Sequence, residues 1–399
     1  DPDLFVDDHV TDGSDAQVTV TVSYGGEPAT PEPLRSWLET VMRPALAEVG
    51  EKGWKTSPYI EWVDPLDPHK GIDPGPTEPR YGTCYMPLRS IPSVLVEMHA
   101  LKPYGERVRA NAAFLSALLS RVGSDPAPLK TARAAAKAAM KGARPGTPFV
   151  LAGETDLSRP ETIDFPAFAW EQVVSPVTGR PRLVYDPKKP MTIPLPFYRH
   201  AKATVTASRP AAYLVPAGWP GIEEKLAAHG LRFTKLAEAR TLAVGTYRAS
   251  EAKYASASYQ GRIRLTAKIA RAVETRTVPA GSLYVPLDDP LAPVAIHLLE
   301  PEGPDSLFAW GLMGSALETK EYIDPRVLEP LAAKMLAEDP KLAAEWKALL
   351  ADPKLAADAR ARHRFFYART PYWDESVGLL PVYRLDAPLE PQTPAAPAP

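Results

Sequence analysis

The sequence has few of the features that mark specialised classes of protein. It contains one cysteine, Cys84, which excludes an internal disulfide and a cysteine-rich metal site. Its 46 lysine and arginine residues are balanced by 48 aspartate and glutamate residues, so no overall field attracts nucleic acid or an anionic membrane. No apolar run reaches the roughly 18 residues of a membrane-spanning helix. The remaining interpretation is a globular chain of 399 residues, 45% hydrophobic, with room for two or three domains.

The first residues do not resemble a signal peptide. They read DPDLFVDDHV and lack a basic stretch followed by an apolar one. Residues 3–10 instead predict a buried strand, and residues 16–24 alternate like a second strand. Because the chain opens on a core strand, we expect that a further segment once preceded it.

Residues 1–125 predict an α/β unit. Apolar residues recur at helical spacing over 33–49, and a short apolar strand is predicted over 91–99. An amphipathic helix is expected after that strand, ending at Gly123. The segment 52–90 is rich in proline, glycine and aspartate, which predicts a long loop that forms one wall of a cleft. Strand, helix and polar junction together indicate the α/β class.

Changes in composition divide the rest of the chain. Residues 126–147 are rich in alanine and lysine and predict a helical linker. Short β-rich runs over 148–300 predict a mixed, mostly β accessory domain. Residues 301–385 predict a helical region, and 386–399 form a proline- and alanine-rich tail with too few apolar side chains to fold.

Aspartate followed by proline marks the start of three helices in the helical region. An aspartate cap with proline at the first helical position is a strong start signal. The three pairs are Asp324-Pro325, Asp339-Pro340 and Asp352-Pro353. Aromatic residues follow at helical spacing, and we expect them to form core rather than a binding platform: Phe365, Phe366, Tyr367, Tyr372 and Trp373.

His9 ends an apolar strand, the position at which open α/β sheets place site residues. Asp7, Asp8 and Asp12 flank it. A neutral imidazole there could bind zinc, with a neighbouring carboxylate orienting the ring. A purely structural histidine is the alternative.

Glu97 ends the strand VLVE, behind three apolar residues. Burying a carboxylate in such a place is costly unless a reaction or a charge partner accounts for it. The residue is therefore either a general base or the partner of Lys102 or Arg107. His99, two residues further, could contribute to the site, although a structural hydrogen bond is the expected role.

Taken together, two segments resemble the zinc carboxypeptidase family, the metallocarboxypeptidases related to carboxypeptidase A. DPDLFVDDHVTDGSD is similar to the strand that carries the family's third zinc ligand, a role that would fall to His9. PSVLVEMHALKPYGERV is similar to the strand with the general-base glutamate, which would be Glu97. Later segments, such as LVPAGWP and FFYARTPYWD, resemble the extra C-terminal region of a bacterial subgroup.

The resemblance implies both a fold and an activity. The fold would be the C-terminal half of a carboxypeptidase-like mixed-sheet α/β domain, followed by a mostly β accessory domain and a helical region. The activity would be hydrolysis of a peptide substrate, in which Zn²⁺ lowers the pKa of a bound water and the glutamate takes its proton. Related bacterial enzymes carry export signals, so a periplasmic or extracellular location is implied.

The family also uses a tyrosine from the loop before the glutamate strand. Tyr81 and Tyr85, in RYGTCYMPLRS, are both candidates. Arg80 and Arg89 are close enough in sequence to bind a substrate carboxylate, or they are solvated loop arginines. Cys84 is expected to be a small buried residue.

The family's first two zinc ligands are missing. They lie in a His-x-x-Glu motif upstream of the third, and nothing here precedes Asp1. One ligand cannot form a three-ligand catalytic site, so we expect the chain alone to be inactive or to depend on a missing N-terminal segment. The one His-x-x-Glu present, His297 to Glu300, lies in a predicted strand, where its two side chains would point to opposite faces.

Two other functions are consistent with the sequence. One is a non-catalytic protein that descends from such a peptidase and binds a peptide or cell-wall ligand. The other is a subunit that completes its site with a partner chain. Retention of stoichiometric metal distinguishes the enzyme from the binding protein.

Overall fold

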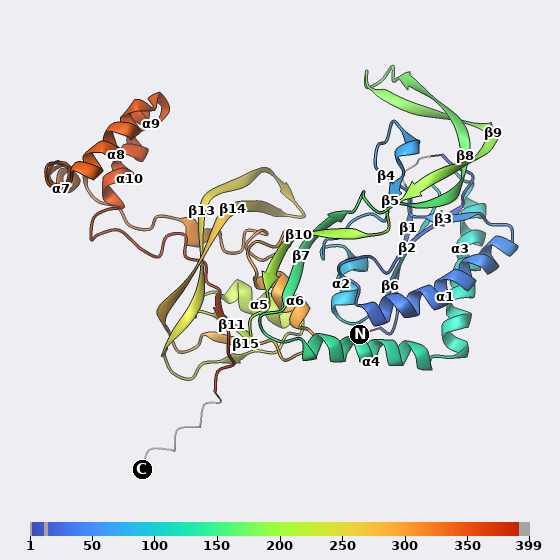
Figure 1. Cartoon of the computed structure of the whole chain (residues 1–399), viewed down its shortest axis with the longest axis horizontal. Coiled ribbons are helices and arrows are strands. Elements are labelled where there is room, and N and C mark those ends of the chain that lie inside the picture. Colours follow the sequence, from blue (N-terminus) through green and yellow to red (C-terminus); the bar gives the residue numbers. More distant parts are fainter. Residues whose placement is uncertain (1, 12–14, 391–399) are drawn as a thin grey trace, which may run out of the picture.

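The computed structural model describes residues 2–11 and 15–390 (Figure 1). Its strands form four sheets, of four, two, six and four strands, and helices pack beside them. The predicted α/β class is therefore confirmed, whereas the carboxypeptidase-like arrangement stays a prediction. Within these residues, no helix is both long enough and apolar enough to cross a membrane. The predicted tail lies largely outside the described residues.

The first sheet contains both strands that the sequence singled out. Its order is β1-β6-β2-β3, with β1 at one edge. β1 runs parallel to β6, whereas β2 is antiparallel to β6 and parallel to β3. The bounds are β1 Phe5–Val10, β2 Val20–Tyr24, β3 Thr56–Pro58 and β6 Ser93–Met98. The second strand thus begins four residues later than predicted.

Three helices pack against this unit: α1 Glu32–Glu51, α3 Tyr104–Ser124 and α4 Ala127–Gly142. Alternation along β6 turns Val94 and Val96 towards α1 and α3, where they pack with buried residues such as Met42 and Phe114. Glu97, between Val96 and Met98, therefore faces the other side of the sheet. The predicted linker is helical over most of its length.

The segment 52–90 is not the continuous loop that its composition predicted. Besides β3, it contains β4 Glu61–Trp62, η1 Pro68–Lys70, β5 Ile72–Asp73 and α2 Gly82–Leu88. Proline suits the first turn of a helix, and Pro68 follows the capping residue Asp67 in this way. The high proline content of residues 52–90 is therefore compatible with the short strands and helices found there.

Two antiparallel strand pairs follow, one nested within the other along the chain. β7 Pro148–Thr155 pairs with β10 Ala201–Ser208, and β8 Glu161–Val174 pairs with β9 Pro181–Phe197. Ile72 of β5 pairs with Phe197 of β9, and Gln17 donates a hydrogen bond to the carbonyl of Ala167 at 2.6 Å. Residues on both sides of the predicted linker share a sheet, and the division into domains stays a prediction.

The largest sheet has the order β12-β15-β11-β16-β13-β14. Its strands are β11 Ala212–Val215, β12 Thr234–Lys235, β13 Arg240–Tyr259, β14 Arg262–Val278, β15 Leu283–Pro286 and β16 Tyr383–Leu385. Two helices, α5 Pro220–Ala228 and α6 Ala292–Leu299, contribute to its core. The predicted helical region thus also contributes a strand to this sheet.

α6 corrects the strand predicted over VAIHLLE. The segment is buried almost throughout, and a fully buried run has no periodicity that separates strand from helix. Pro293 sits in the first turn, where its fixed backbone favours a helix.

The predicted aspartate caps are confirmed. Asp324, Asp339 and Asp352 each accept backbone N–H bonds at the start of a helix, and Asp358 caps a fourth helix that was not predicted. The helices are α7 Pro325–Glu338, α8 Pro340–Ala351, α9 Pro353–Ala357 and α10 Ala359–Tyr367, and Figure 1 shows them clustered away from the sheets. Their core includes buried Phe366 and Tyr367, as expected, although Tyr372 is exposed.

Glu300 is fully buried at the end of α6. The hydroxyl groups of Tyr213 and Tyr247 and the guanidinium of Arg384 all donate to its carboxylate. Burial, together with the charge of Glu300, raises the pKa of both tyrosines, so they remain protonated donors. One carboxylate therefore links α6 to β11, β13 and β16.

We predict that Arg384→Met lowers the free energy of unfolding by about 3 kcal/mol, because it removes the closer of the two arginines at a fully buried carboxylate and leaves only Arg271, at 3.5 Å. Chemical denaturation measures the change. Arg326→Met, which removes an exposed pair with Asp324, is the control and should have little effect. Equal effects of the two variants would contradict a structural role for the buried pair.

Candidate active site

His9 and Glu97 lie side by side. In the parallel register of β1 and β6 they are paired, each one residue before the end of its strand. Neighbouring strands are about 4.8 Å apart, and paired residues in a parallel ladder point to the same face. An imidazole and a carboxylate therefore share one face at the carboxyl ends of two strands, where α/β sheets place their ligands.

Asp7 orients the ring of His9. Its Oδ1 lies 2.9 Å from His9 Nε2, on the same face of β1. The His9 side chain is 54% exposed, and Nδ1 makes no hydrogen bond within the described residues. Asp8, on the opposite face, accepts a bond from Asn111 of α3 at 2.6 Å. Asp12 lies outside the described residues. One ring nitrogen is thus oriented by a carboxylate and the other remains available to a metal.

Glu97 is 9% exposed. Its strand neighbour on β2 is Thr21, which donates to the Glu97 carbonyl at 3.3 Å. Of the two cations considered as partners, Lys102 donates to the carbonyl of Ala16 at 2.6 Å, and Arg107 donates to the carbonyl of Lys102 at 3.1 Å. A general-base role for Glu97 is compatible with this setting and stays a prediction.

His99 is buried beyond the end of β6. Its Nε2 lies 3.3 Å from the backbone nitrogen of Ala16 and 3.9 Å from Asp15. These contacts fit the structural role expected for it.

The segment RYGTCYMPLRS forms helix α2 instead of a loop. Gly82, its first residue, packs on β1: a Cβ there would lie 3.1 Å from the ring of Phe5 and 3.4 Å from Asp7 Oδ2. Tyr81 immediately precedes it and is 40% exposed. Tyr81 is thus one residue from a contact with the aspartate that orients His9.

Tyr85 and Arg89 bind the end of α5. The Tyr85 hydroxyl lies 2.7 Å from His229 Nδ1, and Arg89 donates to the His229 carbonyl at 2.8 Å. Burial, with the charges of Arg89 and Lys225, lowers the pKa of His229, so its ring is neutral at pH 7 and Nδ1 can accept a hydrogen bond from the Tyr85 hydroxyl. This pairing could not be predicted from the sequence, because no recognisable motif surrounds His229.

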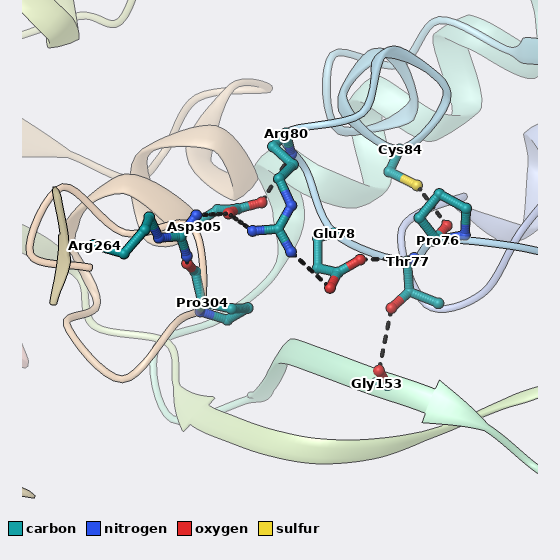
Figure 2. Close-up of polar contacts among 9 residues, drawn as sticks. All are labelled: Pro76, Thr77, Glu78, Arg80, Cys84, Gly153, Arg264, Pro304 and Asp305. Carbon is teal, nitrogen blue, oxygen red and sulfur yellow. Dashed lines mark hydrogen bonds and ion pairs between the residues drawn. The ribbon is translucent and has the colours of Figure 1, made fainter. Parts of the chain in front are cut away.

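Arg80 is held between two carboxylates (Figure 2). Its guanidinium donates to Asp305 at 3.0 Å and to Glu78 at 2.8 Å, and its backbone nitrogen donates to Asp305 at 2.8 Å. Arg264 approaches Asp305 from the other side at 3.6 Å. Substrate binding by Arg80 and Arg89 stays a prediction. Arg80 would have to bind a substrate carboxylate in addition to Asp305 and Glu78, or in place of one of them.

Cys84 is buried, as expected, and its thiol donates to the carbonyl of Pro76 at 3.1 Å (Figure 2). Burial raises the pKa of the thiol to about 12. The thiol therefore remains protonated at neutral pH and is a poor nucleophile.

A small cavity of about 30 Å³ lies beside Cys84 and is lined in part by Ser93 and Leu95. These residues alternate with Glu97 along β6, so they share its face. The cavity is therefore on the same side of the sheet as the candidate base.

The described residues do not contain a group of three or more histidine, cysteine, aspartate or glutamate side chains that could hold a metal ion. His9 contributes one imidazole, whereas a catalytic zinc takes three protein ligands. The His-x-x-Glu of α6 does not fit either, because Glu300 is bound by two tyrosines and an arginine.

Comparison with known proteins gives a partial similarity. No family model matches the chain, and no solved structure matches it. Carboxypeptidase 2 of Trichophyton tonsurans is 31% identical over 113 residues, which is 28% of this chain and 21% of that protein. Probable carboxypeptidase 2 of Arthroderma benhamiae is 30% identical over 107 residues, 27% of this chain and 20% of that protein. The chain spans about a fifth of the length of these relatives, and the similarity suggests that it is carboxypeptidase-like.

Proposed function

We propose that this chain is part of a zinc-dependent metallocarboxypeptidase, with Glu97 as the general base and His9 as one metal ligand. The pairing of His9 with Glu97 on one face of two parallel strands carries the proposal. The partial similarity to fungal carboxypeptidases supports a peptidase. A periplasmic or extracellular site of action is implied by the resemblance alone.

Each residue of the pair has a defined task in this reaction. His9, with Asp7 on its Nε2, offers Nδ1 to a metal. Glu97 accepts a proton from the attacking water and passes it to the nitrogen of the scissile amide as the bond breaks. Zinc, when bound, lowers the pKa of water and polarises the carbonyl.

The described residues do not supply a full set of zinc ligands. On this proposal the remaining ligands come from residues outside the described part of the chain, and the metal site is complete only with them. A non-catalytic peptide- or cell-wall-binding protein is the second candidate, because the described residues lack a three-ligand cluster.

Tyr81 is the better candidate for the assisting tyrosine. Its side chain is exposed, and the next residue, Gly82, begins the helix that packs on β1, the strand of His9. The hydroxyl of Tyr85 is already bonded to His229.

We predict that the chain of residues 1–399 loses added zinc under mild chelation, whereas any longer form that supplies the remaining ligands keeps one zinc per molecule. Metal analysis after dialysis measures this. His9→Ala should remove zinc from the longer form, and His69→Ala, an exposed control, should not. Retention of zinc by the His9 variant would exclude its ligand role, and a longer form without zinc would favour the binding protein.

We predict that Glu97→Gln lowers kcat of the zinc-loaded longer form by about 10²- to 10⁴-fold, because an amide cannot take the proton from water. Release of the C-terminal residue from a peptide measures kcat. Zinc content should be unchanged, and Glu329→Gln, on the exposed face of α7, should retain full activity. A loss confined to KM would contradict the general-base role.

We expect Tyr81→Phe to lower kcat/KM about tenfold, the effect of losing one hydrogen bond to the reacting group. Tyr85→Phe should instead lower stability, because it removes the bond to His229. Peptide hydrolysis and thermal unfolding of both variants test the assignment. The reverse pattern would assign the catalytic role to Tyr85.

A further inference from the structure

A second cavity, of about 320 Å³, lies between α2, α5, α6 and the loop that carries Trp310. We call it the α5 pocket. Its size is that of a small-molecule site, and neither His9 nor Glu97 lines it. Apolar side chains form much of its surface: Leu88, Val294, Leu298, Leu307, Leu312 and Trp310.

Two exposed cationic residues, Lys225 and Arg262, line the α5 pocket. Among the described residues, no carboxylate lies within ion-pair distance of either one. Arg262 begins β14 directly after a tight turn in which Gln260 and Gly261 have φ of +51° and +74°, so its backbone position is fixed. These two positive charges are available to a ligand.

The acidic residue of the pocket is already neutralised. Asp305 is paired with Arg80 at 3.0 Å and lies 3.6 Å from Arg264 (Figure 2). Arg80 is shared with Glu78 at 2.8 Å. The remaining charge in the pocket is therefore positive, and it favours an anion over a cation.

His297 adds a polar group to the pocket. It is 8% exposed, and its ring packs edge-on against Phe149 with the centroids 5.1 Å apart. It makes no hydrogen bond within the described part of the chain. Burial lowers its pKa to about 4, so it is neutral at pH 7 and offers one donor and one acceptor. Because His297 lines the pocket, a ligand there could form a hydrogen bond with its ring.

We propose that the α5 pocket binds a small organic carboxylate with an apolar body. The body lies against the leucines and Trp310, and the carboxylate is bound by Lys225 and Arg262. Arginine binds a planar carboxylate in a bidentate manner, which favours this anion. The site is separate from the His9 and Glu97 pair, because neither residue lines it, although Arg80 and Tyr85 do.

The test is calorimetric titration of the 1–399 chain with 3-phenylpropanoate, 3-phenylpropan-1-ol and acetate. The propanoate should bind at least tenfold more tightly than either of the others, because only it combines the apolar body with the charge. Lys225→Gln and Arg262→Gln should each weaken its binding about tenfold and leave binding of the alcohol unchanged. Lys347→Gln, an exposed charge change on α8, is the matched control and should have no effect.

Several results would overturn the proposal. One is no binding of 3-phenylpropanoate at millimolar concentration, and another is equal affinity of the chain for the alcohol and the propanoate. The others concern the variants: unchanged affinity for the propanoate in both Lys225→Gln and Arg262→Gln, or an equal loss of that affinity in the Lys347→Gln control. Both substituted side chains are exposed, so loss of folding does not account for a loss of binding. Zinc content and peptidase activity play no part in the readout, so failure here leaves the proposed peptidase function untouched.

Discussion

The parallel ladder between β1 and β6 brings an imidazole and a carboxylate together from distant parts of the chain. The register of this ladder determines whether His9 and Glu97 share a face, because a slip of one residue in either strand would turn its side chain to the opposite face. The valines of β6 fix that register: Val94 and Val96 must face α1 and α3, which turns Glu97 away from the helices. The hydrophobic core thus determines which polar groups meet on the other face.

α2 lies between the first sheet and the helices beside the largest sheet. At its start, Gly82 packs on Phe5 and Asp7 of β1. Further along, Tyr85 bonds to His229 of α5, and Arg80, just before the helix, bonds to Asp305 after α6. The residues between the candidate site and the α5 pocket are therefore held on both sides, so the two regions share one structural support.

Local signals predicted local structure well. Aspartate followed by proline located three helix starts, since the cap and the fixed proline backbone act within a few residues. Proline-rich composition failed over 52–90, because it describes a segment and not the short elements within it. The fully buried α6 was predicted as a strand, since a helix that is apolar on all sides has no period to detect.

Resemblance, rather than pattern, singled out His9 and Glu97 together, and the contacts around them came only from the structure. Arg80 with Asp305 and Tyr85 with His229 are pairs between distant segments, and nothing near either partner in the sequence indicates the other.

Within the described residues β1 is an edge strand, so the outer row of its backbone N–H and C=O groups is open to another strand. A strand paired there would lie beside the exposed imidazole, so extension of the sheet and shielding of His9 would be one event.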